Sequence, residues 1–325
     1  MNTEQKVLIG GAIALVVAAA LWEFTAGPIA KGTEITTETL KINGHLPVLW
    51  VFYNTSEVNS RQWYDFGARS SRVLNIPLMN LLYNTIAAYS KDEYRIEVIE
   101  GVEGVARVLG GWDRLPWTMQ HAKAQVTEPE EDWIRNAILA EHGGLWLSSS
   151  VICMGKFGVL PKDKVVFFGQ DDDGMYGSKI PGFRCVWSPR KGHEIFIEME
   201  ERCRGRLEGQ LGGRQVRGDS KSDWIEIASQ RKDIEIRVKA EMSRNPYTNQ
   251  TLELEDLFAA GTEGRLPFEI PSDICYIRIP YRDLLDRRQW GYVLRMSEEQ
   301  IMESDIVIKY VLLESKNRHV NQKKQ

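Results

Sequence analysis

Residues 132–153 read D-W-I-R-N-A-I-L-A-E-H-G-G-L-W-L-S-S-S-V-I-C, and the rest of the chain can be placed around them. The first half has the composition of an amphipathic helix, and Gly143 and Gly144 can adopt the positive φ angles that close a helix. Thr127 and Glu130 lie upstream at the spacing of a capping box, which marks a helix start. Aliphatic and aromatic residues follow the glycines, so we expect a helix that turns directly into a strand.

Two charged residues share one edge of this predicted helix. Asp132 and Arg135 are three positions apart, a spacing at which helical side chains are neighbours. Ile134, Ala137 and Ile138 supply the apolar stripe that would face a core. The helix therefore carries an acidic and a basic group beside its buried face.

The order Asp-x-x-Arg, an aliphatic run, Gly-Gly, an aromatic residue and a strand resembles the donor-site segment of capsular polysaccharide synthesis proteins and of glycosyltransferase family 32. The resemblance implies an α/β fold of the GT-A type, the fold of nucleotide-diphospho-sugar transferases, with a mixed sheet flanked by helices. It also implies a nucleotide sugar as donor, a glycan as acceptor, and a first strand whose end contacts the nucleotide base. The donor-binding positions that it carries over are Asp132, Arg135, Gly143, Gly144, Trp146, Ser148 and Ser150.

The chain departs from these families at the end of that strand. The families have Asp-x-Asp or Asp-Ala-Thr, whose first aspartate helps to hold a divalent metal against the pyrophosphate, whereas this chain has Ser148, Ser149 and Ser150. A hydroxyl is a weak, neutral ligand for Mg²⁺ or Mn²⁺, which prefer carboxylate and phosphate oxygens. Dependence on Mn²⁺ or Mg²⁺ would therefore need carboxylates from elsewhere in the chain.

An acidic run further along could supply those carboxylates. Residues 164–169 form an apolar β-type segment, and Asp171, Asp172 and Asp173 follow it. Ligands of α/β folds bind at the carboxyl ends of strands, so Asp171 and Asp172 are candidate catalytic groups, and Asp171 and Asp173 are candidate metal ligands. The alternative is a solvated Asp-Gly turn, which is ordinary chemistry at the end of a strand.

Composition excludes several other classes of protein. The 325 residues, 43% of them hydrophobic, suffice for one sizeable core. The net charge is −4 and no zinc-finger, recognition-helix or RNP-type pattern occurs, so we do not expect nucleic acid as a partner. The four cysteines are far apart in sequence, which favours buried thiols or an occasional disulfide over zinc. P-loop, Rossmann, Gly-x-Ser-x-Gly and His-Glu-x-x-His patterns are absent.

The N-terminal segment predicts a single membrane anchor. Residues 7–22 carry no charge, and the apolar character extends to about residue 26. Lys6, in the leader of residues 1–6, favours a cytoplasmic N-terminus with the domain on the opposite side of the bilayer. A signal peptide and a buried soluble helix are the alternatives; Glu4 weakens the first, and the apolar surface all round the helix weakens the second.

The remaining segments alternate between strand and helix patterns, as in a helix-covered sheet. We expect strands over residues 47–53, 94–99, 182–187, 234–238 and 272–281. We expect helices over residues 60–89 (divided at Pro77), 193–206, 223–229, 252–260 and 298–313. The predicted division of the chain is a linker over 27–44, the transferase-like domain over 45–315, with a basic loop over 202–217, and a basic flexible tail over 316–325.

Three aromatic or basic side chains have two interpretations each. Trp112 and Trp117 could stack on a base or a sugar, or they could pack in the core. His142, beside the glycine pair, is interpreted as an exposed cation that favours the helix dipole rather than as a catalytic base.

Two classes of function follow. In the first, the protein is a membrane-anchored glycosyltransferase in which Asp132 and Arg135 orient the donor and Arg135 counters the pyrophosphate charge. In the second, a degenerate transferase fold serves as a membrane-tethered structural or interaction protein, for example in an envelope or virion-type assembly. Acidic groups that converge on Ser148 to Ser150 would favour the enzyme, and serines that bond only to one another or to the backbone would favour the scaffold.

Overall fold

The computed structural model describes residues 46–54, 76–120, 126–170, 181–209, 220–261 and 264–323. The predicted membrane anchor at 7–22, the linker at 27–44 and the acidic run Asp171 to Asp173 lie outside these residues. Within the described part of the chain, no helix combines the length and the apolar character needed to cross a membrane.

The described residues form an α/β protein with a mixed sheet flanked by helices. The central sheet has the strand order β2-β1-β3-β6-β5-β7. All its neighbouring pairs are parallel except β3 with β6 and β6 with β5, so β6 runs against the other strands. In chain order the strands are β1 (Val48–Tyr53), β2 (Arg95–Glu100), β3 (Gly144–Ser148), β5 (Val165–Gln170), β6 (Pro181–Ser188) and β7 (Ile234–Arg237).

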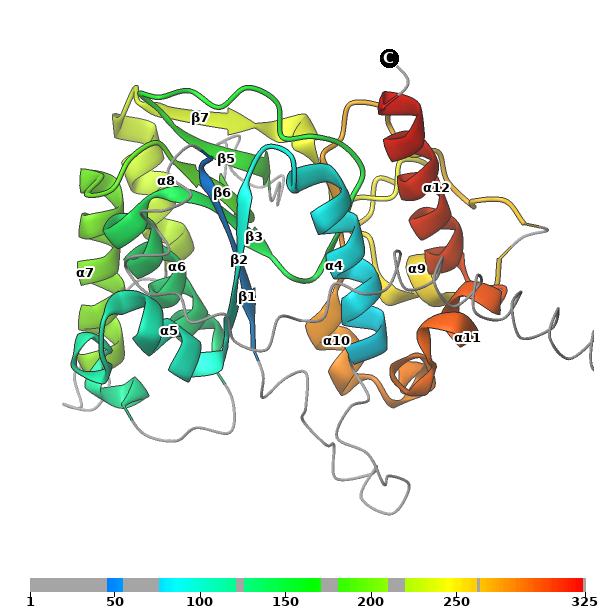
Figure 1. The fold of residues 1–325 in the computed structure, drawn as a ribbon, viewed down its shortest axis with the longest axis horizontal. Coiled ribbons are helices and arrows are strands. Elements are labelled where there is room, and N and C mark those ends of the chain that lie inside the picture. Colours follow the sequence, from blue (N-terminus) through cyan, green and yellow to red (C-terminus); the bar gives the residue numbers. More distant parts are fainter. Residues whose placement is uncertain are drawn as a thin grey trace, which may run out of the picture. The chain divides into compact units, whose positions relative to one another are not determined.

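Helices cover both faces of this sheet (Figure 1). On one face lie α5 (Gly101–Leu109), α6 (Glu128–His142), α7 (Glu194–Gly209) and α8 (Ser220–Gln230). On the other lie α4 (Ile76–Ser90), α9 (Leu254–Phe258), α10 (Tyr281–Asp286), α11 (Glu298–Glu303) and α12 (Val307–Gln322). Short 3₁₀ turns connect these elements: η2 (Trp112–Arg114), η3 (Trp117–Met119), η5 (Val238–Ala240), η6 (Arg288–Trp290) and η7 (Val293–Arg295).

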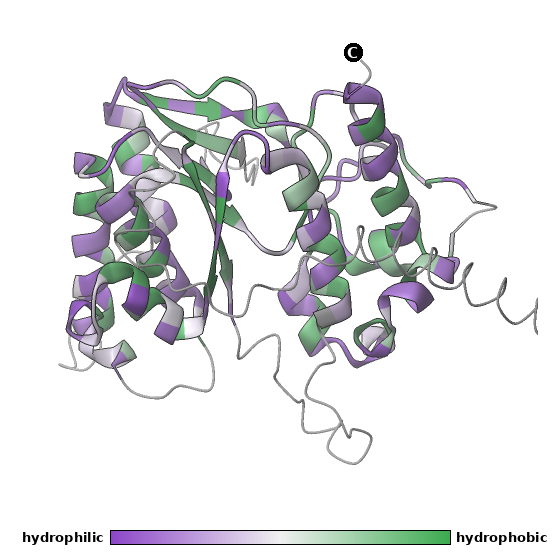
Figure 2. Ribbon diagram, in the orientation of Figure 1, coloured by the Kyte–Doolittle hydropathy of each residue, from purple (hydrophilic) through white to green (hydrophobic). Residues whose placement is uncertain are grey.

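The second face has a small sheet of its own, with the order β4-β9-β8. Its strands are β4 (Val151–Cys153), β8 (Glu241–Met242) and β9 (Tyr276–Arg278). The hydrophobic core on this side joins α4, β4 and the C-terminal helices. Figure 2, coloured by hydropathy, shows hydrophobic residues along the central strands and both hydrophobic and hydrophilic residues on the helices. Ser315 on α12 is buried here; its hydroxyl donates to the Cys153 carbonyl (2.6 Å), and its own carbonyl accepts from the Tyr89 hydroxyl (2.7 Å).

The predicted helix-to-strand segment is confirmed. The Thr127 backbone N–H donates to the Glu130 carboxylate (2.8 Å), which completes the capping box at the start of α6. Gly143 and Gly144 have φ angles of +67° and +95°, and β3 begins at once. The strands β1, β2, β5, β6 and β7 are also confirmed, as is the part of the 60–89 helix that is described (α4); residues 60–75 lie outside the described residues.

Four boundaries differ from the prediction. The strand expected over 272–281 is limited to β9 (Tyr276–Arg278), and α10 begins at Tyr281. The segment from Arg202 to residue 209 continues α7 instead of forming a loop, because Arg202 and Arg204 make ion pairs with glutamates four residues away on the same helix. The predicted flexible tail is helical as far as Gln322, where α12 ends. The helix expected over 298–313 is interrupted between α11 and α12 by an extended Ser304 (φ −67°, ψ 160°).

Candidate functional site

One edge of the central sheet collects the ends of several strands. Because β1, β2, β3, β5 and β7 run in the same direction, their carboxyl ends meet at this edge together with the amino end of β6. The chain leaves β1 toward β2 on one side, whereas β3 pairs on the other side of β1. Such a reversal of strand order opens a crevice, and ligands of open α/β sheets bind there. We call this edge, at the ends of β1 and β3, the strand-end site.

The end of β1 connects the strand-end site to the start of α6. Asn54, which follows β1, is buried, and its side-chain amide donates to the Val126 carbonyl (2.9 Å) just before α6. Burial raises the pKa of the neighbouring Tyr53, and the nearby Tyr83 and Glu100 raise it further. The Tyr53 phenol therefore stays neutral at physiological pH, as a hydrogen-bonding group with an aromatic face.

Ser148 and Ser150 lie at the end of β3, as predicted for donor-site residues. Their hydroxyl oxygens are 3.0 Å apart, and both side chains are half-buried. The Ser150 carbonyl accepts from the Ile279 backbone N–H (3.0 Å), which ties this turn to the small sheet. The pair is neutral and internally hydrogen-bonded, so it offers hydroxyl groups but no charge to a ligand.

Asp132 and Arg135 form the expected ion pair on α6, with 2.7 Å between a guanidinium nitrogen and a carboxylate oxygen. Arg135 is only 4% exposed, because its guanidinium also lies over the Phe183 ring (5.0 Å to the centroid). Phe183 belongs to β6 near its amino end, which is at the strand-end site. Arg135 therefore fastens α6 to this edge, and Asp132 is the more exposed partner, at 20% of its side chain.

The glycine pair and Trp146 occupy a different part of the sheet. Gly143 and Gly144 stand at the amino end of β3, four residues or about 13 Å from Ser148. The Gly143 carbonyl accepts from the Trp50 indole (2.8 Å), and Trp146 is buried at 1% exposure against Phe52. These positions shape the turn and the core, and the structure does not bring them to the strand-end site.

The acidic candidates Asp171, Asp172 and Asp173 lie outside the described residues. The residue before them, Gln170, ends β5 at the strand-end site. Among the described residues, no group of three or more His, Cys, Asp or Glu side chains is placed to hold a metal ion. A divalent cation at this edge would therefore depend on the acidic run.

An ion pair that the sequence did not indicate lies beside the strand-end site. Arg184, on β6, is 3.4 Å from the carboxylate of Glu241 on β8, whose side chain is 2% exposed. Gly169, near the end of β5, makes room for this pair, because a Cβ there would lie 2.3 Å from a Glu241 carboxylate oxygen. The two residues are 57 positions apart, so no local pattern could have linked them. The Arg184 side chain is 29% exposed, so it is not fully enclosed by this pair.

His142 differs from the sequence interpretation. It is half-buried, its ring packs at a tilt of 41° against Trp50 (5.3 Å between ring centroids), and its Nε2 lies 2.9 Å from the Val108 carbonyl. Burial lowers the pKa of His142, so the ring is neutral rather than an exposed cation. Its Nε2–H then donates to Val108, a structural role distant from the strand-end site.

Comparison with protein-family models and with curated proteins gives no match. The assignment of function therefore depends on the residues at the strand-end site.

Proposed function

We propose that this protein is a membrane-anchored glycosyltransferase of the GT-A type, which transfers a sugar from a nucleotide-sugar donor to a glycan acceptor. The observation that carries the proposal is the strand-end site itself. The reversal of strand order between β1 and β3 has Asn54 and Ser148 at its two strand ends, and the Asp132–Arg135 pair is anchored beside it through Phe183.

Each group at this edge has chemistry suited to one part of a nucleotide sugar. Tyr53 and Asn54, at the end of β1, suit the base and the ribose, because they combine an aromatic face with hydrogen-bonding atoms. Ser148, Ser150 and the accessible part of Arg184 suit the pyrophosphate, since hydroxyl and guanidinium groups donate to phosphate oxygens. Asp132 suits a sugar hydroxyl, and Arg135 keeps it in position.

These residues would act mainly by stabilising charge on the departing nucleoside diphosphate. Ser148 and Ser150 fit phosphate oxygens better than a divalent cation, so the described residues alone support a cation-independent donor site in which Arg184 supplies the positive charge. In this proposal Asp171 or Asp172 takes the proton from the acceptor hydroxyl. Mn²⁺ or Mg²⁺, if used, would be held by Asp171 and Asp173 and would supply further positive charge to the pyrophosphate.

A second candidate function is a catalytically degenerate transferase fold that serves as a membrane-tethered structural protein. One observation favours it: Ser148 and Ser150 bond to each other. A structural role needs the fold but no charged donor site.

Calorimetry distinguishes the two. The full-length chain, purified in detergent, is titrated with UDP- and GDP-sugars in the presence and absence of Mn²⁺. We expect binding by wild type, at least tenfold weaker binding by Arg184→Gln, and wild-type binding by the control Ser229→Ala, whose hydroxyl only caps its own helix at Glu226. Absence of heat with every nucleotide sugar, in a chain shown to be folded by circular dichroism, would exclude the enzyme and leave the structural role.

A further inference from the structure

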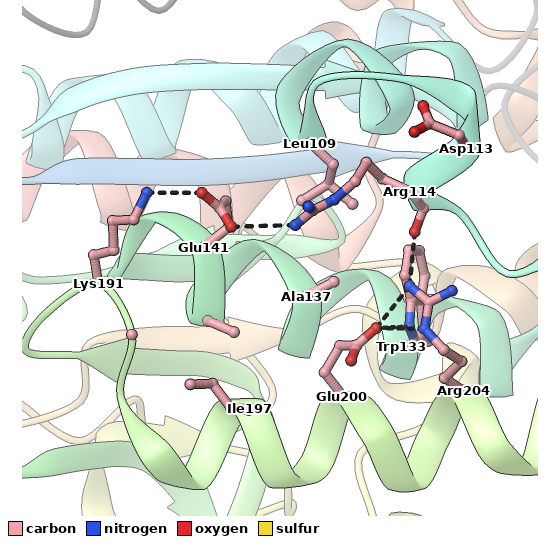
Figure 3. Close-up of a pocket in the computed structure, with 12 residues that line it drawn as sticks. Leu109, Asp113, Arg114, Trp133, Ala137, Glu141, Lys191, Ile197, Glu200 and Arg204 are labelled. Carbon is pink, nitrogen blue, oxygen red and sulfur yellow. Dashed lines mark hydrogen bonds and ion pairs between the residues drawn. The ribbon is translucent and has the colours of Figure 1, made fainter.

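A groove of about 490 Å³ lies outside the strand-end site, between α6 and α7, with η2 at its rim. Its floor consists of short and aliphatic side chains, including Leu109, Ala137 and Ala140, and Ile197 on α7 is 42% exposed (Figure 3). The volume is within the range of roughly 300–1,000 Å³ that is usual for small-ligand sites. Small residues on α6 thus leave a hollow that no side chain of the described chain fills.

Charged side chains stand at the two ends of the groove (Figure 3). At one end, Glu141 accepts from Lys191 (2.7 Å) and lies 3.4 Å from Arg114. The hydrogen bond and charge of Lys191 hold the pKa of Glu141 below its ordinary value, so the carboxylate stays ionised.

At the other end, Glu200 accepts from the Trp133 indole (2.7 Å) and from Arg204 (2.9 Å). Arg204 also donates to the Arg114 carbonyl (2.7 Å), which fastens η2 to α7. Each end of the groove therefore offers a fixed carboxylate acceptor directly beside cationic donors.

This arrangement selects for a neutral, hydroxyl-rich ligand. The cationic side chains of the lining, Arg114, Lys191 and Arg204, are matched by the acidic Asp113, Glu141 and Glu200, so a polyanion gains no net attraction. A sugar hydroxyl both donates and accepts, and neighbouring carboxylate and guanidinium groups satisfy both needs at once. The apolar floor between the two ends can cover the C–H surface of a pyranose ring.

An exposed tryptophan lies in η2, next in the chain to residues that line the groove. Trp112 directly precedes Asp113 and Arg114, which line the groove, and it is 45% exposed; Trp117 is 43% exposed. The alternative that these two tryptophans pack in the core is therefore wrong. The exposed face of Trp112 is large enough for a sugar ring to stack on, and its indole N–H can donate a hydrogen bond.

We propose that the groove between α6 and α7 is a saccharide-binding site for a neutral oligosaccharide, which stacks on Trp112 and places hydroxyl groups between the Glu141 and Glu200 clusters. The inference rests on the proposed function in one respect, namely that the saccharide is the acceptor chain. Trp133, at one end of the groove, directly follows Asp132 on α6, so a chain in the groove extends toward the strand-end site.

The test measures saccharide binding without any nucleotide sugar. Neutral hexasaccharides of glucose (α-1,4 and β-1,4), mannose and N-acetylglucosamine are titrated into the detergent-purified full-length chain, with polygalacturonate as the anionic arm. We expect millimolar or tighter binding of at least one neutral hexasaccharide. Trp112→Ala and Ala140→Trp, which remove the platform and fill the floor, should each weaken it at least tenfold, whereas Tyr247→Ala, at another exposed aromatic residue, should not.

Three results would overturn the proposal: no binding of any neutral hexasaccharide, binding that is unaffected by both groove variants, or stronger binding of polygalacturonate. Self-association that Ala140→Trp abolishes, without saccharide binding, would also overturn it and assign the groove to a second copy of the chain. Saccharide binding that persists when no nucleotide sugar binds would leave the groove intact as a carbohydrate site and exclude only the proposed transferase.

Discussion

Arg135 and Arg184 differ in exposure because different residues surround them. Arg135 belongs to the Asp-x-x-Arg pattern, yet Phe183 covers its guanidinium and Asp132 neutralises it. Arg184 belongs to no pattern, yet its side chain stays partly exposed near the end of the strands. Sequence reasoning found the ion pair of α6 because its spacing is local, and it missed Arg184 because Glu241, its partner, is distant in sequence.

His142 gives a pH prediction at the same scale. Because burial lowers its pKa in the folded state, the unfolded chain binds its proton more readily, and stability that is fully present above pH about 6.5 is lost as the pH falls below that value. Glutamine can still donate to the Val108 carbonyl but does not titrate. We therefore expect His142→Gln to reduce the slope of the unfolding free energy against pH below about pH 6.5. The reduction is at most about 1.4 kcal/mol per pH unit, the limit for one proton.

Urea unfolding at several pH values between 8 and 5 measures this effect. The control is Ser229→Ala on α8, which removes a side chain that does not titrate and only donates to the Glu226 carbonyl, and should leave the acid loss unchanged. If wild type and His142→Gln lose stability in parallel over the whole range, the neutral state of His142 in the fold is refuted.

At the scale of elements, the junction between α6 and β3 was predictable almost to the residue. A capping box, an apolar stripe and two glycines mark the start, the buried face and the end of the helix. All of these signals are local in sequence, so no distant contact is needed to predict the junction. The junction between β3 and β4 was not. Ser148 to Ser150 lie where the chain leaves one sheet for another, and this turn is fixed by the distant Ile279.

Gly144 is the most constrained point of the α6 to β3 junction. Its φ angle is +95°, and a Cβ there would lie 2.6 Å from the Val48 carbonyl oxygen. We expect Gly144→Ala to destabilise the fold by about 3 kcal/mol or more, because backbone strain adds to a clash with the neighbouring strand.

Gly110 provides the control, since it has nearly the same φ angle (+92°) and nothing within 4 Å of an added Cβ. Gly110→Ala should therefore cost only about 1–2 kcal/mol, the strain alone. Urea unfolding followed by tryptophan fluorescence measures both free-energy changes. Equal destabilisation by the two variants would show that the clash with Val48 does not contribute.

For the whole molecule, the sequence predicted a mixed sheet covered by helices but not its strand order. Hydrophobic periodicity reports which residues are buried and says nothing about strand direction, so the reversed β6 could not be foreseen. The small sheet is a further case, because β4, β8 and β9 come from widely separated parts of the chain and are each two or three residues long.

The C-terminal helix tests how far the molecule depends on such distant contacts. α12 contributes Val307, Ile308, Val311 and Leu312 to the core, and Ser315 links α4 to β4. We expect a chain that ends at residue 306 to be insoluble or rapidly proteolysed, whereas a chain that ends at residue 320 should be as resistant to limited trypsin digestion as wild type. Equal resistance of both would mean that α12 is dispensable.

The position of Ser315 has a consequence for the newly made protein. Tyr89 on α4 is synthesised more than two hundred residues before the serine whose carbonyl it contacts. A ribosome adding about 5–20 residues per second leaves that face of α4 without its partner for about ten seconds or longer. During this time the apolar face of α4 that later packs against α12 is uncovered. We therefore expect a holding chaperone that binds this face to raise the yield of folded protein.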